Sequence, residues 1–240
     1  MDWDDWNAAL FDLDGVLTPT TDLHRRAWGE MFTAFGERHG LAEPYTEDDY
    51  YAHVDGKPRF DGVRAFLASR GVRLAEGGLD DGPEAQTVHG LGNAKQELFN
   101  DLLTSGGMDP YPGTLDLLDD LAARGVARAV VSSSRNATAV LAAAGLSDRF
   151  AFVVDGNVAA ERGLPGKPDP ATFLAAATQL DIPVARCVVL EDALAGVAAG
   201  RAGGFGLVIG VDRGAGADAL RGAGADITVS DLTQLLEDRR

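Results

Sequence analysis

A short apolar segment that ends in two carboxylates constrains the fold of this chain most. Ala8, Ala9, Leu10 and Phe11 lead directly into the sequence Asp12-Leu13-Asp14-Gly15. Alternate side chains of an extended segment point to the same side, so the two carboxylates would converge. Aspartate is depleted inside strands, but the carboxyl ends of strands in open α/β sheets are where ligands bind. Two converging carboxylates repel each other, and a hard cation such as Mg²⁺ would relieve that repulsion.

The same motif is compatible with two other structures. Asp and Gly favour turns, and calcium-binding loops also use acidic residues at alternate positions. A calcium loop would continue with further oxygen ligands and a Glu near its twelfth position, whereas Val16 and Leu17 follow here. The calcium loop is therefore disfavoured, and the choice between a turn and a metal site depends on the rest of the chain.

Composition excludes several classes of protein. A net charge of −16 has the wrong sign for a protein that binds a nucleic-acid backbone. The single cysteine, Cys187, cannot form an intramolecular disulfide, and its apolar neighbours indicate a buried strand position. The acidic first residues are unlike a signal peptide, and no apolar run has the length of a membrane span. We expect a monomeric cytoplasmic protein without nucleic-acid or membrane partners.

Hydrophobic periodicity predicts an α/β fold. Strand patterns cover residues 7–13, 127–132, 150–154, 187–190, 206–211 and 226–229. Helical patterns cover residues 23–35, 94–102, 115–124, 137–144, 171–180, 194–202 and 232–239. Their alternation predicts a doubly wound, Rossmann-like parallel sheet with helices on both faces. Residues 26–105 contain no convincing strand, so we predict that they form an inserted helical domain, with residues 1–25 and 106–240 forming the α/β core.

Three further polar motifs follow predicted strands. Ser132 begins the run Ser132-Ser133-Ser134-Arg135-Asn136, whose hydroxyls and main-chain N–H groups could hold a phosphate or simply cap a helix. Lys167 lies in a proline-rich loop that could equally be a solvated turn. Glu191 and Asp192 directly follow a buried strand, and a metal would relieve the cost of that arrangement. Together with the first motif, these residues supply a nucleophile, metal ligands and phosphate ligands, a set suited to phosphoryl transfer.

This ordered set of motifs resembles the haloacid dehalogenase superfamily over essentially the whole chain. The family's four motifs match Asp12-Leu13-Asp14-Gly15, Ser132, Lys167 and the pair Glu191-Asp192. The inserted helical domain is similar to the cap of that superfamily. The opening that runs through Thr20 and His24, the cap loop at residues 54–59 and the later blocks resemble the β-phosphoglucomutase branch. Pro19 and Asp55 depart from that branch, where an acidic and a basic residue respectively are common.

The resemblance implies roles for the motif residues of the core. Asp12 would attack a phosphoryl group and form an aspartyl phosphate, and Asp14 would act as general acid and base. Mg²⁺ would be held by the Asp12 side chain, the Asp14 main-chain carbonyl and Asp192, with help from Glu191. Ser132 and Lys167 would neutralise the phosphoryl oxygens.

The resemblance also implies that the cap contributes to substrate binding. Arg59 would hold a second phosphate with help from Lys57, although both could be exposed loop charges. Lys95 would contact the substrate, and an ordinary surface lysine is the alternative; His24 would act near the hinge, unless it is a helix-surface histidine without function. The expected substrate-binding residues are Thr20, His24, Gly56, Lys57, Arg59, Lys95, Ser133, Ser134, Arg135 and Asn136.

The activity implied is conversion of β-D-glucose 1-phosphate to glucose 6-phosphate, with Mg²⁺ as cofactor and a sugar bisphosphate as activator. A sugar-phosphate phosphatase uses the same site with water as the acceptor, and the sequence separates the two poorly. A binding module without catalysis is a third possibility, but the presence of every motif residue disfavours it.

Overall fold

The computed structural model describes residues 1–55, 57–106 and 108–236, and these divide into two compact units. The first, here called the core unit, comprises Met1–Pro19 and Met108–Arg240; the second, the cap unit, comprises Thr20–Gly107. The boundary expected after residue 25 falls within helix α1 (Thr20–His39), which belongs wholly to the cap unit. Each unit is described by itself below.

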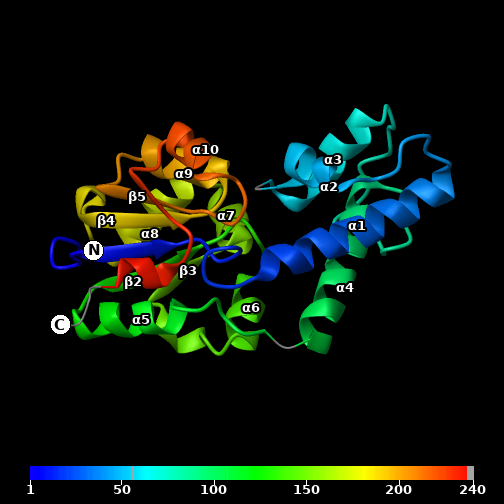
Figure 1. Cartoon of the computed structure of the whole chain (residues 1–240). Helices are drawn as coiled ribbons and strands as arrows, with labels where there is room; N and C mark the ends of the chain where they lie inside the picture. The colour runs from blue at the N-terminus through cyan, green and yellow to red at the C-terminus, as the bar shows by residue number, and fades with distance from the viewer. Residues whose placement is uncertain (56, 107, 237–240) are drawn as a thin grey trace. The chain divides into compact units, whose positions relative to one another are not determined.

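The core unit contains one parallel six-stranded sheet in the order β3-β2-β1-β4-β5-β6 (Figure 1). Its strands are β1 (Ala8–Phe11), β2 (Ala127–Val131), β3 (Phe152–Val154), β4 (Cys187–Glu191), β5 (Leu207–Val211) and β6 (Ile227–Val229). Alternation with helices confirms the predicted Rossmann-like α/β fold. The first strand is shorter than predicted because the chain turns after Asp12, where the Leu17 N–H donates to the Leu13 carbonyl at 3.0 Å.

The helices of the core unit agree with the predicted periodicity where they are long. They are α5 (Thr114–Ala123), α6 (Ala137–Ala143), α7 (Gly156–Arg162), α8 (Ala171–Leu180), α9 (Leu194–Ala202) and α10 (Ala217–Ala223). Of the three seven-residue helices, α6 was predicted, and it buries three apolar residues. Helices α7 and α10 were not predicted, because α7 has no buried residue and α10 buries only Leu220, so neither shows an apolar face. The helix predicted at residues 232–239 is a 3-10 turn, Leu232–Leu235, and residues 237–240 lie outside the described part.

Strand order places a switch point between β1 and β4. The chain leaves β1 towards β2 on one side and leaves β4 towards β5 on the other. Ligands of open α/β sheets bind beyond the carboxyl ends of strands at such a point. Phe11 pairs with Leu190, so Asp12 and Glu191 emerge next to each other at the end of two fully buried strands.

The cap unit is built from helices around an aromatic core. Its elements are α1, α2 (Glu47–Asp49), the π-helix η1 (Tyr50–Val54), α3 (Arg59–Ser69) and α4 (Val88–Gly106). Trp28 and Phe32 of α1 stack on each other, and Phe32 also contacts Phe66 of α3. Arg59, expected in a loop, is the first residue of α3. In the described part of the chain, no helix combines the length and hydropathy needed to span a membrane.

Candidate active site at the switch point of the sheet

Lys167 forms ion pairs with two carboxylates at the ends of neighbouring strands. Its Nζ lies 2.5 Å from Asp12 Oδ1 and 2.5 Å from Glu191 Oε1, and donates to the Val131 carbonyl at 3.0 Å. Only 4% of the Lys167 side chain and 10% of the Asp12 side chain are exposed. The ammonium therefore uses its three donors on three strand ends, β1, β2 and β4.

The charges of this group depend on one another. Burial raises the pKa of Asp12, and the charges of Glu191 and Asp14 raise it further; Lys167 opposes them, yet the pKa stays well above its ordinary value. Burial lowers the pKa of Lys167, but the attraction of Asp12 and Glu191 outweighs burial and raises it. Lys167 is thus held as a cation, and more positive charge beside Asp12 would favour its ionised form.

Three carboxylates of the site could share a cation. Asp12, Glu191 and Asp192 each offer an oxygen, and these atoms lie within 4.8 Å of one another. Two of the three residues are buried, which is costly for carboxylates without compensating charge. A hard divalent cation with oxygen ligands fits this donor set.

Glycines leave the space that two of these carboxylates occupy. A Cβ on Gly15, which has a φ of +85°, would lie 1.9 Å from Asp192 Oδ2. A Cβ on Gly196 would lie 1.7 Å from Glu191 Oε1. The other oxygen of Glu191 accepts a hydrogen bond from the Ala193 N–H at 2.9 Å. Glu191 is thus fixed by Lys167, by main chain and by close packing.

The loop after β2 brings hydroxyls to the same strand ends. The Ser132 hydroxyl donates to Asp14 Oδ2 at 3.5 Å and accepts from the Ser134 N–H at 3.0 Å. The Ser134 hydroxyl in turn accepts from the Asn136 N–H at 3.1 Å. The structure thus brings together the core residues that the sequence singled out: Asp12, Asp14, Ser132, Lys167, Glu191 and Asp192. Ser133, Ser134, Arg135 and Asn136 continue the Ser132 loop into α6.

In the cap unit, Lys95 is buried with His24. Lys95 is 3% exposed, and its Nζ lies 2.5 Å from His24 Nδ1. The ammonium also lies 4.7 Å from the ring centroid of Phe99, on which His24 stacks at 4.2 Å. The alternative of an ordinary surface lysine is wrong, because Lys95 lies on the face of α4 that packs against α1. The sequence did not indicate this burial, because a charged residue is usually exposed.

The remaining cap candidates lie on or beside α3 and at the start of α1. Arg59 Nη1 donates to Gln96 Oε1 at 2.8 Å, and its guanidinium lies 4.9 Å from the Phe60 ring centroid. Lys57 is exposed, and its Nζ donates to the His53 carbonyl at 2.9 Å. Thr20 is a buried first residue of α1. Gly56 lies outside the described residues.

Two residues that the sequence analysis missed contact the site loops. Asn157 of α7 donates through Nδ2 to the Arg135 carbonyl at 2.9 Å, and so braces the Ser132 loop. Arg213, after β5, donates through Nε to the Gly15 carbonyl at 2.8 Å. The only signal for either residue was its position after a strand of the sheet, because neither lies in a motif with a chemical signature.

Comparisons with known proteins support the fold and show the family. The model of the haloacid dehalogenase-like hydrolase family matches residues 6–204. A β-phosphoglucomutase of Mycobacterium bovis is 46% identical over 95% of this chain and 91% of its own length, and one of Bacillus subtilis is 31% identical over 97% and 96%.

Among solved structures, CbbY of Rhodobacter sphaeroides with xylulose-1,5-bisphosphate has a TM-score of 0.75 at 26% identity, covering 96% of both chains. A Clostridium difficile β-phosphoglucomutase has a TM-score of 0.78, covering 96% of this chain and 93% of its own; at 24% identity it supports the fold alone. This chain is an enzyme of the haloacid dehalogenase superfamily and belongs to its β-phosphoglucomutase-like branch.

Proposed function

We propose that this enzyme transfers a phosphoryl group on a sugar phosphate through an aspartyl phosphate on Asp12. The observation that carries the proposal is the buried Asp12 carboxylate at the switch point, held by Lys167 at 2.5 Å and flanked by further acids. A carboxylate nucleophile needs nearby positive charge to approach an anionic phosphate, and Lys167 supplies one such charge.

In the proposed first step, an oxygen of Asp12 forms a bond to phosphorus while the bond from phosphorus to the donor oxygen breaks. Asp14 gives its proton to that leaving oxygen. In the second step, an acceptor hydroxyl returns a proton to Asp14 and attacks phosphorus, which releases Asp12. The two carboxyl groups thus divide the work of nucleophile and proton carrier between them.

Asp12, Asp192 and the Asp14 main-chain carbonyl are the proposed ligands of Mg²⁺. When bound, the cation would neutralise charge that develops on the transferring phosphoryl group and would favour ionised Asp12. Glu191 has one oxygen on Lys167 and the other on the Ala193 N–H. The proposed role of Glu191 is therefore to orient Lys167 as well as to help bind the cation.

The Ser132 loop is the proposed phosphate-binding loop. Its hydroxyl groups and main-chain N–H groups offer neutral donors, and Lys167 adds a charged one. Donors fixed in advance stabilise the charge of the transition state without reorganisation during the reaction. Ser133, Ser134, Arg135 and Asn136 remain proposed substrate contacts on the same basis.

The proposed reaction is conversion of β-D-glucose 1-phosphate to glucose 6-phosphate, with a sugar bisphosphate as activator. Its support is the 46% identity to a β-phosphoglucomutase over nearly the whole chain. Arg59 is the proposed ligand of the second phosphate, because a guanidinium suits bidentate phosphate contacts. A sugar-phosphate phosphatase is the second candidate, supported by the match to the haloacid dehalogenase-like hydrolase family.

One coupled assay tests both candidates. The enzyme is incubated with β-glucose 1-phosphate, Mg²⁺ and a trace of glucose 1,6-bisphosphate, while glucose 6-phosphate and free phosphate are measured together. A mutase forms glucose 6-phosphate with little free phosphate; one phosphate released per substrate consumed, without glucose 6-phosphate, contradicts the mutase and supports the phosphatase.

Two further arms test the mechanism. Asp12→Asn should lower kcat at least about a thousandfold in either reaction, as losing a nucleophile does elsewhere. EDTA should abolish activity, and Mg²⁺ should restore it, because the acidic cluster favours a hard cation. Substantial turnover by the folded Asp12→Asn variant rules out the aspartyl phosphate, and full activity in EDTA rules out the metal.

A further inference from the structure

Arg213, in the loop between β5 and α10, joins three segments of the core unit. Its Nε donates to the Gly15 carbonyl at 2.8 Å, and its Nη1 donates to the Ser230 carbonyl at 2.8 Å. Its guanidinium carbon lies 3.7 Å from the ring centroid of Tyr111. The side chain thus spans the turn after Asp14, the end of β6 and the segment that returns from the cap unit.

The first of these segments is the turn that carries Asp14. The Gly15 N–H donates to the Thr18 carbonyl at 2.9 Å, and the Thr18 N–H donates to the Leu13 carbonyl at 3.1 Å. These hydrogen bonds close the turn internally. The Gly15 carbonyl points instead to Arg213, so this guanidinium fixes the peptide plane adjacent to the Asp14 carbonyl.

The segment that returns from the cap unit, which carries Tyr111 and Thr114, contacts the same turn from another side. The Tyr111 N–H donates to the Leu17 carbonyl at 2.9 Å, and the Thr114 hydroxyl donates to the same carbonyl at 3.2 Å. Because Arg213 stacks on the Tyr111 ring, it contacts both the turn and the segment that supports the turn. Its removal would loosen both supports together.

We propose that Arg213 is a positioning residue that fixes the turn at residues 13–18, and thereby Asp14, for phosphoryl transfer; the catalytic part of this proposal rests on the proposed function. The guanidinium is needed for its shape. Two diverging N–H donors reach two main-chain carbonyls while the flat face lies on an aromatic ring. The ammonium of a lysine cannot make these three contacts at once.

Hydrogen exchange and kinetics of Arg213→Ala and Arg213→Lys test the proposal. Arg221→Ala is the matched control, because Arg221 of α10 is 54% exposed and contacts Asp218 and Thr228 at the surface. In both Arg213 variants, main-chain amides of residues 13–18 should exchange faster than in the wild type. We expect kcat to fall about 10- to 100-fold, as small misplacements of catalytic groups do, with KM changed less than about threefold. Arg221→Ala should change neither measurement.

Chemical rescue separates positioning from a loss of folded protein. Guanidinium ion at millimolar concentration should restore part of the lost kcat in Arg213→Ala, and ammonium ion should not. Unchanged exchange at residues 13–18 in Arg213→Ala overturns the proposal, as does an unchanged kcat or equal rescue by ammonium. If the wild type transfers no phosphoryl group, the proposed function fails, while the exchange measurement still decides whether Arg213 fixes the turn.

Discussion

At the scale of single residues, Glu191 illustrates how closely the site is packed. One oxygen contacts Lys167 and the other accepts from main chain, while α9 approaches the carboxylate at Gly196. Removing one of the carboxylate oxygens would leave the buried charge of Lys167 without one partner. Adding an atom beside the carboxylate would displace it. The carboxylate is therefore sensitive to substitutions that do not touch it chemically.

Gly196→Ala tests this sensitivity. The new Cβ would lie 1.7 Å from Glu191 Oε1, so the carboxylate must move and Lys167 loses one of its two acidic partners. We expect activity to fall about 100-fold, the scale of small misplacements at a catalytic group. The measurement is kcat together with the melting temperature.

The matched control for this prediction is Gly222→Ala in α10. A Cβ there meets nothing within 4 Å, and alanine favours helices. This variant should keep full activity and gain up to about 1 kcal/mol of stability. Wild-type kcat in Gly196→Ala would show that the position of Glu191 does not matter for the reaction.

At the scale of elements, the sequence predicts the helices and strands that have a repeating apolar pattern, and it does not predict elements without one. Helices α8 and α9 have the predicted bounds, because each shows an apolar face over several turns. The strands before Asp12 and Glu191 were found because buried strands of a parallel sheet read as apolar runs. Helix α7 was missed because it shows no apolar face. The contacts of Asn157 and Arg213 were missed because they join segments far apart in the chain. The gathering of polar residues at strand ends was thus predictable from the sequence, but the side chains that support them were not.

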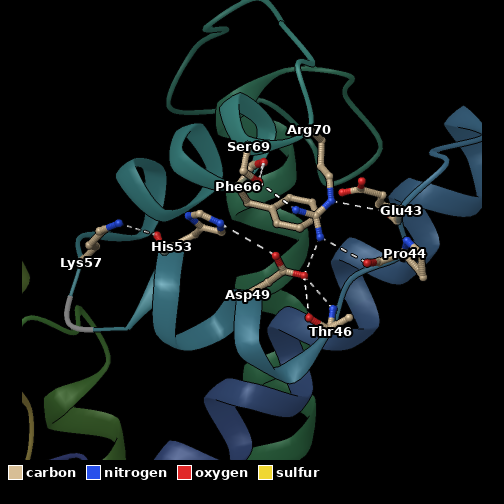
Figure 2. A network of polar contacts seen from close by, with 9 residues as sticks. All are labelled: Glu43, Pro44, Thr46, Asp49, His53, Lys57, Phe66, Ser69 and Arg70. Atoms are coloured by element: carbon tan, nitrogen blue, oxygen red, sulfur yellow. Dashed lines mark hydrogen bonds and ion pairs between the residues drawn. The ribbon is translucent and has the colours of Figure 1, made fainter.

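A polar network in the cap unit joins α2 and the π-helix to the end of α3 (Figure 2). Asp49 Oδ2 accepts from the N–H and the hydroxyl of Thr46 at 2.8 and 3.0 Å, and from Arg70 Nη2 at 2.6 Å. Arg70 also donates to the Pro44 carbonyl at 3.2 Å. The network fixes the elements on both sides of the segment that carries Lys57.

The variant Asp49→Asn tests the network through the pH dependence of the free energy of unfolding. Burial raises the pKa of Asp49, but hydrogen bonds from Arg70 and Thr46 outweigh burial and hold it below its ordinary value of 3.8. The carboxylate therefore stabilises the fold fully above about pH 4, and this contribution is lost as pH falls through the lowered pKa. At pH 7 the free energy of unfolding of the variant should be about 2 kcal/mol lower than that of the wild type. This difference should shrink as the pH falls.

Denaturation of Asp49→Asn and the wild type at several pH values provides the measurement. Asp48→Asn is the control, because Asp48 is an exposed neighbour in the same helix and should unfold like the wild type. A difference between Asp49→Asn and the wild type that grows as pH falls would contradict the role assigned to the network.

At the scale of the whole molecule, the chemistry is divided unevenly between two units. The acids, the hydroxyl loop and Lys167 all belong to the core unit, whereas Arg59 and Lys95 belong to the cap unit. In the proposed mechanism, the core residues alone form and break the bond to phosphorus. The cap cations are then the proposed means of selecting between substrates with one and with two phosphates. The monomeric state and the cytoplasmic location stay predictions.

Arg59→Ala tests this division of labour. If Arg59 binds the second phosphate, its loss should lower mutase turnover strongly, because a bisphosphate is no longer held for its second transfer. Hydrolysis of a chromogenic ester with one phosphate should change less than about threefold, since nothing in that ester needs Arg59. The ratio of the two activities is the measurement. Arg64→Ala, on the same helix, is the control, because Arg64 forms exposed ion pairs with Asp61 and Glu76. Equal loss of both activities in Arg59→Ala would mean that Arg59 supports the cap fold or the transfer itself, and not the second phosphate.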